Sequence, residues 1–135
     1  MNKILVAYDG SEDSKKALDQ AVELAKCTTS SMVILTVVPS ATGMFAFDDL
    51  LVPGTFKSRA LKMVQEAAKH TQGVSTTGIT REGDIADEIL RASEELGCDL
   101  VVIGRRGLGK VERFLLGSVA EKVIKHSSKP VLMVR

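Results

Sequence analysis

The sequence is poor in aromatic residues, with no tryptophan, one tyrosine and four phenylalanines among 135 residues. Proteins that bind single-stranded nucleic acid stack the bases on aromatic side chains set among basic ones. Tyr8 is the single tyrosine, and no stripe of aromatic and basic residues accompanies it. The formal net charge of +1 also gives no general attraction for a polyanion. We therefore expect no nucleic-acid partner, and any anion site has to be local.

Cysteines and long apolar runs are scarce as well. Cys27 and Cys98 stand far apart and lack zinc-ligand spacing, which argues against a disulfide framework or a metal site. We expect both to be small buried side chains. No apolar run reaches the ~18 residues of a membrane span, and the N-terminus MNKILVAYDG is too short and wrongly flanked for a signal peptide. These absences predict a cytoplasmic protein with no membrane partner.

The sequence does contain a regular alternation of short β-branched runs and helical patterns. Unbroken apolar runs are typical of parallel strands that helices cover on both faces. A weaker fifth candidate is VSTTGIT at 74–80. The four clear runs are 3–9, 31–38, 99–104 and 130–134.

Helical periodicity fills the gaps between these runs. Ser118 and Glu121 match the S-x-x-E capping box, so Ser118 should cap the last helix. Strands that alternate with helices predict an α/β fold, in which one domain, residues 1–135, forms an open five-stranded parallel sheet with helices on both faces. If the strand order is 3-2-1-4-5, a ligand crevice lies between the carboxyl ends of strands 1 and 4. The helical segments follow Ser11, Pro53, Asp84 and Gly117.

The stretch IGRRGLGKVERFLLGS, residues 103–118, carries the clearest candidate site. Gly104, Gly109 and Lys110 fit the frame of a P-loop, but Val111 stands where a serine or threonine should hold magnesium. A P-loop also places its lysine at the immediate start of a helix, whereas the helix signal here arrives seven residues later. The P-loop interpretation therefore fails.

A second frame, G-x2-G-x9-G-S, fits every position through Gly104, Gly107, Gly117 and Ser118. Glycines at the tip of a strand let the backbone approach a ligand closely, since they carry no Cβ. The second pair leads into a helix N-terminus, where free amides and the helix dipole bind anions. Each pair alone would be an ordinary turn or cap. Their fixed separation favours a site for a phosphate chain.

This frame resembles the ATP-binding subgroup of the universal stress protein family, and the resemblance covers the whole chain. YDGSEDS, REGD, CDLVVIG and KPVLMV fall where the family has corresponding segments. The resemblance implies a Rossmann-like, adenine nucleotide alpha hydrolase-like sheet in the order 3-2-1-4-5. It also implies ATP, with magnesium, as ligand and a homodimer through the C-terminal edge strand, 130–134. The implied function is a nucleotide-dependent stress-response or signalling module that acts through its dimer or an unknown protein partner.

The resemblance also assigns roles to residues at matching positions. Asp9 would lie near the ribose or a magnesium ion, the backbone of Val37 near the adenine, and Ala7 in the wall of the base pocket. Asp9 could equally cap the first helix in place of Ser11.

For the phosphates, the resemblance implies that Gly104 and Gly107 border the ribose and phosphate chain. Gly117, Ser118 and Val119 would hold the phosphates at the helix start. The loop cations could add charge to this site, or could lie in a solvated loop. These cations are Arg105, Arg106 and Lys110.

The segment 39–56 holds three of the four phenylalanines and is too apolar for a plain loop. It could form a lid, cover a sheet edge or meet a partner, and we favour a partly helical flap packed on its own domain.

Two alternatives to a binding module, an enzyme and a phosphoacceptor domain, remain open for this chain. A slow ATP hydrolase or nucleotidyl-transferring enzyme of the same superfamily would need an acid or base near the phosphates, and the sequence offers no clear candidate. We therefore assign no catalytic residue. A phosphoacceptor receiver domain would need clustered acids after strand 1 and an aspartate at the tip of strand 3. Asp9 stands alone, and the third run ends in Ile79-Thr80-Arg81.

Overall fold

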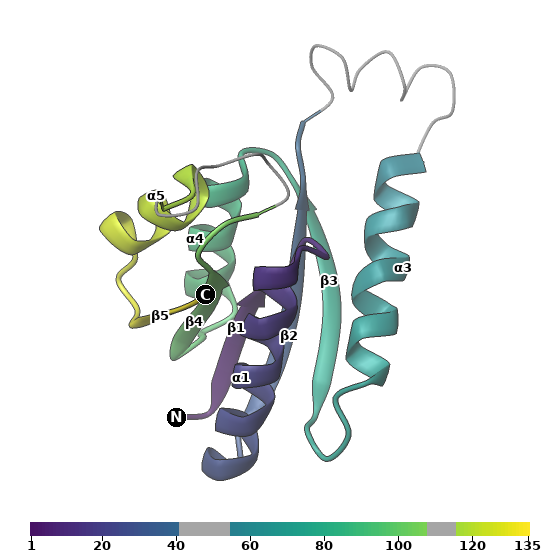
Figure 1. The fold of residues 1–135 in the computed structure, drawn as a ribbon, viewed down its shortest axis with the longest axis vertical. Coiled ribbons are helices and arrows are strands. Elements are labelled where there is room, and N and C mark those ends of the chain that lie inside the picture. The colour runs from purple at the N-terminus through teal and green to yellow at the C-terminus, as the bar shows by residue number, and fades with distance from the viewer. Residues whose placement is uncertain (41–54, 108–115) are drawn as a thin grey trace.

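The computed structural model describes residues 1–40, 55–107 and 116–135. The lid hypothesis for segment 39–56 and the role of Lys110 therefore fall largely outside the described residues. Among the described residues, strands and helices alternate along the chain (Figure 1). The strands are β1 (Lys3–Ala7), β2 (Ser31–Val38), β3 (Thr76–Glu82), β4 (Leu100–Gly104) and β5 (Val131–Val134). The helices are α1 (Glu12–Thr28), α3 (Thr55–Lys69), α4 (Ile85–Glu95) and α5 (Ser118–His126).

The five strands form one parallel sheet in the order β3-β2-β1-β4-β5, which confirms the predicted α/β fold and strand order. Ala7 of β1 pairs with Leu35 of β2, and Gly104 of β4 pairs with Val134 of β5. Since all strands run the same way, their carboxyl ends meet at one edge. β3 and β5 lie at the two sides of the sheet.

Helices cover both faces of the sheet (Figure 1). Successive side chains of a strand point to opposite faces, so β1 sends Ile4 and Val6 to one core and Leu5 and Ala7 to the other. The first core is completed by α1 and α3, and the second by α4 and α5. This two-sided burial explains why the central strands have no polar alternation.

A tight turn joins β1 to α1 at the carboxyl edge. Gly10 adopts φ +82°, a conformation that glycine reaches without a Cβ clash. Ser11 is the N-cap, because its side chain accepts a hydrogen bond from the Ser14 amide at 3.2 Å. Asp9 Oδ1 accepts the Ser11 amide at 2.9 Å. Asp9 therefore fixes the turn before the helix and does not replace Ser11 as its cap.

Three sequence-based boundaries differ from the structure. The first strand ends at Ala7 instead of residue 9, because the Asp9 side chain forms the turn just described. The third strand is Thr76–Glu82 instead of 74–80, in register with β2 up to the pair Val38–Glu82. The predicted capping box is also wrong. Gly117 is the N-cap of α5, with no side-chain cap bond, and Ser118 is the first helical residue.

The two cysteines lie in different environments. Cys98 is buried as expected, and desolvation raises the pKa of its thiol. Cys27 is exposed in the last turns of α1, so the expectation that it is buried is wrong. In the described part of the chain, no helix combines the length and apolar character that crossing a membrane requires.

Candidate functional site

A cavity of about 590 Å³ lies at the carboxyl edge of the sheet. Its walls come from the ends of β1, β2 and β4 and from the N-terminal turns of α3, α4 and α5. The volume lies within the roughly 300–1,000 Å³ typical of small-molecule sites. Ten of the residues singled out for the site from the sequence line this one cavity, and the remaining one, Lys110, lies outside the described residues. The ten are Ala7, Asp9, Val37, Gly104, Arg105, Arg106, Gly107, Gly117, Ser118 and Val119.

One wall of the cavity is apolar. Leu35 and Val37 come from β2, Ile103 from β4, and Ile89 and Val119 from α4 and α5. These side chains belong to the core on the α4 and α5 face, which fixes their positions. Such a surface suits a flat apolar group, and strand backbone at its border can supply hydrogen bonds.

The N-terminus of α5 forms the polar end of the cavity. The Gly117 amide donates to the carbonyl of Arg105 at 2.9 Å, which ties the start of α5 to the tip of β4. A Cβ on Gly117 would lie 3.1 Å from that carbonyl oxygen and 3.3 Å from Cα of Arg106. The first amides of α5, at Ser118 and Val119, have no intrahelical acceptor and carry the positive end of the helix dipole. This end of the cavity can therefore bind an anion.

Gly104 has a packing role that was not predicted from the sequence. A Cβ there would lie 2.8 Å from the carbonyl carbon of Asp13 and 2.9 Å from Cβ of Asp13. The missing side chain thus makes room for the first turn of α1, which packs directly on the end of β4. Gly104 lines the cavity, but glycine is required at this position because α1 packs too closely to leave room for a Cβ.

Gly107 and Asp9 approach each other across the cavity edge. A Cβ on Gly107 would lie 2.6 Å from Oδ2 of Asp9, so glycine lets this loop pass close to the carboxylate. The described residues contain no group of three or more histidine, cysteine or acidic side chains that could hold a metal ion by itself. A magnesium ion at Asp9 would therefore need ligand atoms from a bound phosphate chain, which is the usual arrangement for magnesium.

The two arginines after β4 have different surroundings. The amide of Arg106 donates to Oδ2 of Asp13 at 3.3 Å, and its Nε lies 3.9 Å from the same oxygen. Arg106 is therefore held against α1 by an acidic partner, and is more than a solvated loop residue. Arg105 lines the cavity, and its Nε is buried without a hydrogen-bond partner among the described residues.

The contribution of α3 to the cavity was not predicted from the sequence. Phe56, Arg59 and Met63, from its first turns, line the cavity on the side opposite to α4 and α5. A usable signal was present, because α3 follows β2 and so begins at the same carboxyl edge as the predicted crevice. Ile85 and Ile89, in the first turns of α4, follow the same logic.

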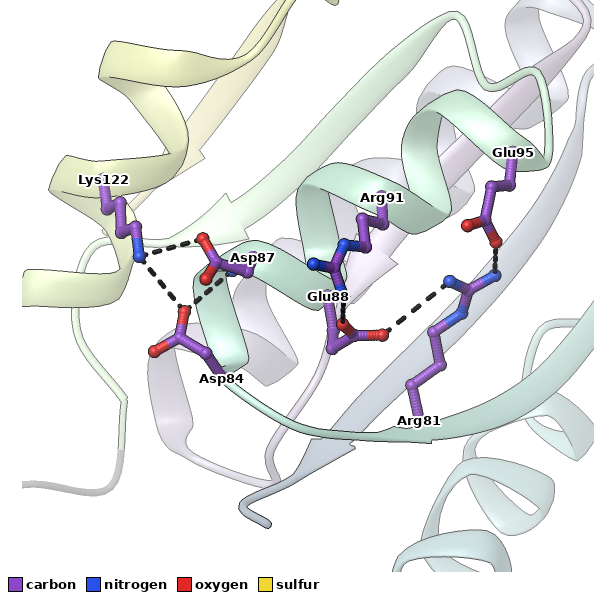
Figure 2. A network of polar contacts seen from close by, with 7 residues as sticks. All are labelled: Arg81, Asp84, Asp87, Glu88, Arg91, Glu95 and Lys122. Atoms are coloured by element: carbon purple, nitrogen blue, oxygen red, sulfur yellow. Dashed lines mark hydrogen bonds and ion pairs between the residues drawn. The ribbon is translucent and has the colours of Figure 1, made fainter.

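An ionic network fixes α5 relative to α4 (Figure 2). Lys122 Nζ of α5 lies 3.2 Å from Asp84 Oδ2 and 2.9 Å from Asp87 Oδ1 at the start of α4. Asp84 is also the N-cap of α4, accepting the Asp87 amide at 3.0 Å. On the other side of α4, Arg81 bridges to Glu88 and to Glu95 (Figure 2). Asp84, the last residue of the REGD segment, is thereby linked to α5, whose N-terminus borders the cavity.

Asp84→Asn should make the protein less stable at pH 7, and this loss of stability should be smaller at pH 3. The Asp87 amide and then Lys122 hold the pKa of Asp84 below its ordinary value of 3.8. A lowered carboxyl pKa stabilises the fold above the ordinary value, and this stabilisation is lost as the pH falls through the folded-state pKa. Asparagine keeps the cap acceptor and removes only the charge. Urea unfolding at both pH values measures the difference, and an equal difference at both would contradict this account.

Comparisons with known proteins agree with the fold and cover the whole chain. The model of the universal stress protein family matches residues 1–135. Universal stress protein YxiE of Bacillus subtilis is 38% identical over 146 residues, covering 99% of each chain. The solved structures that share the fold include two universal stress proteins. Universal stress protein UspA from Lactobacillus plantarum has a TM-score of 0.87 and 23% identity, with 99% of this chain and 97% of that chain covered.

The second structure is a universal stress protein in complex with cAMP. It has a TM-score of 0.74 and 25% identity, and the match covers 99% of this chain and 97% of that chain. The family match spans the frame of Gly104, Gly107, Gly117 and Ser118 together with all five strands. This chain therefore belongs to the universal stress protein family.

Proposed function

We propose that this chain binds ATP with magnesium in the cavity at the carboxyl edge and acts as a nucleotide-dependent stress-response or signalling module. The observation that carries the proposal is the convergence of Asp9, Val37 and the glycine frame on one cavity of about 590 Å³. The complex of a related universal stress protein with cAMP supports an adenine nucleotide as the ligand class.

The two ends of the cavity suggest the orientation of the nucleotide. The adenine fits the apolar wall of Leu35, Val37 and Ile89, close to the carboxyl end of β2. The phosphates fit the N-terminus of α5, where the amides of Ser118 and Val119 are donors without intrahelical acceptors. Asp9 lines the same cavity, beside Gly107, and its carboxylate is suited to the ribose or to a magnesium ion held by the phosphates.

The proposed output is a change in an interaction surface, and hydrolysis is slow or absent. Asp9 is the one acid among the described lining residues, which include no histidine, and in this proposal its carboxylate is engaged by the ribose or the magnesium ion, so no general base is left for a water at the phosphates. Strand β5 lies at the side of the sheet and pairs with β4 alone among the described strands, so its outer backbone groups can pair with a second copy of β5. We propose a homodimer through this edge, and the cytoplasm as location.

Calorimetry with ATP, ADP, AMP and cAMP, each with and without magnesium, tests the proposal directly. ATP with magnesium should bind more tightly than AMP, because the N-terminus of α5 adds contacts for each further phosphate. Failure of every adenine nucleotide to bind would contradict the proposal. If the protein alone hydrolyses ATP and releases phosphate over many turnovers, the hydrolase alternative is correct and the binding-module proposal is wrong.

Asp9→Asn should reduce the gain in ATP affinity that magnesium gives by roughly tenfold, or about 1.4 kcal/mol, because a neutral amide oxygen replaces a charged carboxylate oxygen as a ligand of the ion. Asparagine keeps an oxygen that can accept the Ser11 amide, so the turn should survive. Titration of wild type and variant with and without magnesium measures the effect. An unchanged magnesium dependence would exclude Asp9 from the ion.

A further inference from the structure

Arg105 is bonded through its backbone to two parts of the molecule that are far apart in sequence. Its amide donates to the carbonyl of Val134, the last residue of edge strand β5, at 2.7 Å. Its carbonyl accepts the amide of Gly117, the N-cap of α5, at 2.9 Å. One residue therefore connects the anion-binding end of the cavity to edge strand β5.

One nitrogen of the half-buried Arg105 side chain, Nε, lacks a hydrogen-bond partner in the part of the chain that the structure describes. Arg105 lines the cavity, and its Nε is buried without a hydrogen-bond partner within residues 1–40, 55–107 and 116–135. A buried charged donor without an acceptor is costly, so a rearrangement that gives the guanidinium an anionic partner is favourable. Phosphate is a suitable partner, since the planar guanidinium can donate two parallel hydrogen bonds to it.

The neighbouring Arg106 does not share this arrangement. Its amide and its Nε both face the carboxylate of Asp13, at 3.3 and 3.9 Å. Arg106 is thereby tied to α1, whereas the backbone bond to β5 comes from Arg105. The contrast identifies Arg105 as the arginine through which a ligand can act on the edge strand.

Strand β5 is short, so a change at Arg105 can alter how well the strand is ordered. It has four residues, pairs with β4 alone among the described strands, and ends at the register pair Gly104–Val134. Its residues are half-buried, apart from the more exposed Met133. The bond from the Arg105 amide to Val134 extends this pairing by one step beyond the last residue of β4.

We propose that Arg105 couples occupancy of the cavity to the order of edge strand β5. A phosphate group that engages the guanidinium fixes Arg105, and the fixed backbone strengthens the bond to Val134 and the end of the strand. This inference rests on the proposed function, because it takes ATP as the ligand. Coupling between two sites is reciprocal. A partner strand that orders β5, such as β5 of a second copy, must therefore increase the affinity for ATP by the same factor.

Hydrogen exchange of the full chain, with and without saturating ATP and magnesium, tests the coupling. In wild type, ATP should slow exchange of peptides that contain residues 131–135 by roughly 5-fold or more, the lower end of typical coupling between sites. Arg105→Gln should remove this protection at saturating ATP. Arg106→Gln is the matched control, and it should keep the protection once saturated. Calorimetry on each variant gives the ATP concentration that saturates it.

The possible outcomes separate the inference from the proposed function. If wild type binds ATP and exchange at 131–135 does not change, the coupling is wrong and ATP binding stands. If Arg105→Gln keeps the protection, the coupling does not pass through Arg105. If wild type binds no ATP, both proposals fail. Arg105→Lys, which keeps the charge but not the two-pronged geometry, should give partial protection and serves if the glutamine variant does not fold.

Discussion

Gly117→Val is expected to weaken ATP binding about 100-fold or more while the sheet remains folded. The added side chain would begin 3.1 Å from the Arg105 carbonyl oxygen and 3.3 Å from Cα of Arg106, both backbone atoms. Either the β4 tip or the start of α5 must move, which displaces the amides of Ser118 and Val119. Two hydrogen bonds to a charged phosphate, at about 1.5 kcal/mol or more each, correspond to about 100-fold in affinity.

Calorimetry with ATP and magnesium measures the loss, and circular dichroism with thermal unfolding checks the fold. Thr77→Val, an exposed position on β3 far from the α5 terminus, controls for the introduction of a valine. A folded Gly117→Val protein with wild-type affinity would remove the N-terminus of α5 from the site.

Gly104→Ala is expected to lower the free energy of unfolding by about 1–3 kcal/mol, the usual cost of overpacking. The new Cβ would lie 2.8 Å from the carbonyl carbon of Asp13 and 3.0 Å from its carbonyl oxygen. These atoms belong to the first turn of α1, so the helix as a whole must move away from β4. The effect should appear in the absence of any nucleotide.

Gly107→Ala provides the matched comparison for Gly104→Ala. Its Cβ would meet Oδ2 of Asp9 at 2.6 Å, which is the end of a side chain and can rotate away. Stability should therefore change by only about 0.5 kcal/mol, while ATP binding should suffer because Asp9 is displaced. Urea unfolding of the two variants tests the distinction. Wild-type stability of Gly104→Ala would contradict the packing role of Gly104.

The fold could be predicted from the sequence for the strands that helices bury on both faces. Strands β2 and β4 are continuous apolar runs, and their bounds agree with the prediction within one residue. The third strand was shifted by two residues because TTGITRE has little apolar character, and its register is set by pairing with β2. The sequence of a strand at the side of a sheet does not contain that pairing information.

The gathering of Asp9 and the glycine frame in one cavity followed from topology, since carboxyl ends of neighbouring parallel strands share an edge. The expectation for Val37 came from the family resemblance alone. The particular atoms that each glycine meets could not be predicted. Gly104 faces Asp13 of α1, and that contact depends on how closely a helix packs on a strand end. Ser118 shows the same limit, because S-x-x-E marks a helix start without specifying which residue becomes the cap.

Analysis of the nucleotide that the protein retains through purification tests the central claim most directly. The protein is purified without added nucleotide and denatured, and the released compounds are identified and quantified by chromatography and mass spectrometry. The account predicts ATP at close to one molecule per chain, or, in protein that has lost it, calorimetric binding of added ATP with magnesium. An empty protein that also fails to bind ATP with magnesium would contradict the account. The glycine frame would then be explained by turns and helix packing alone.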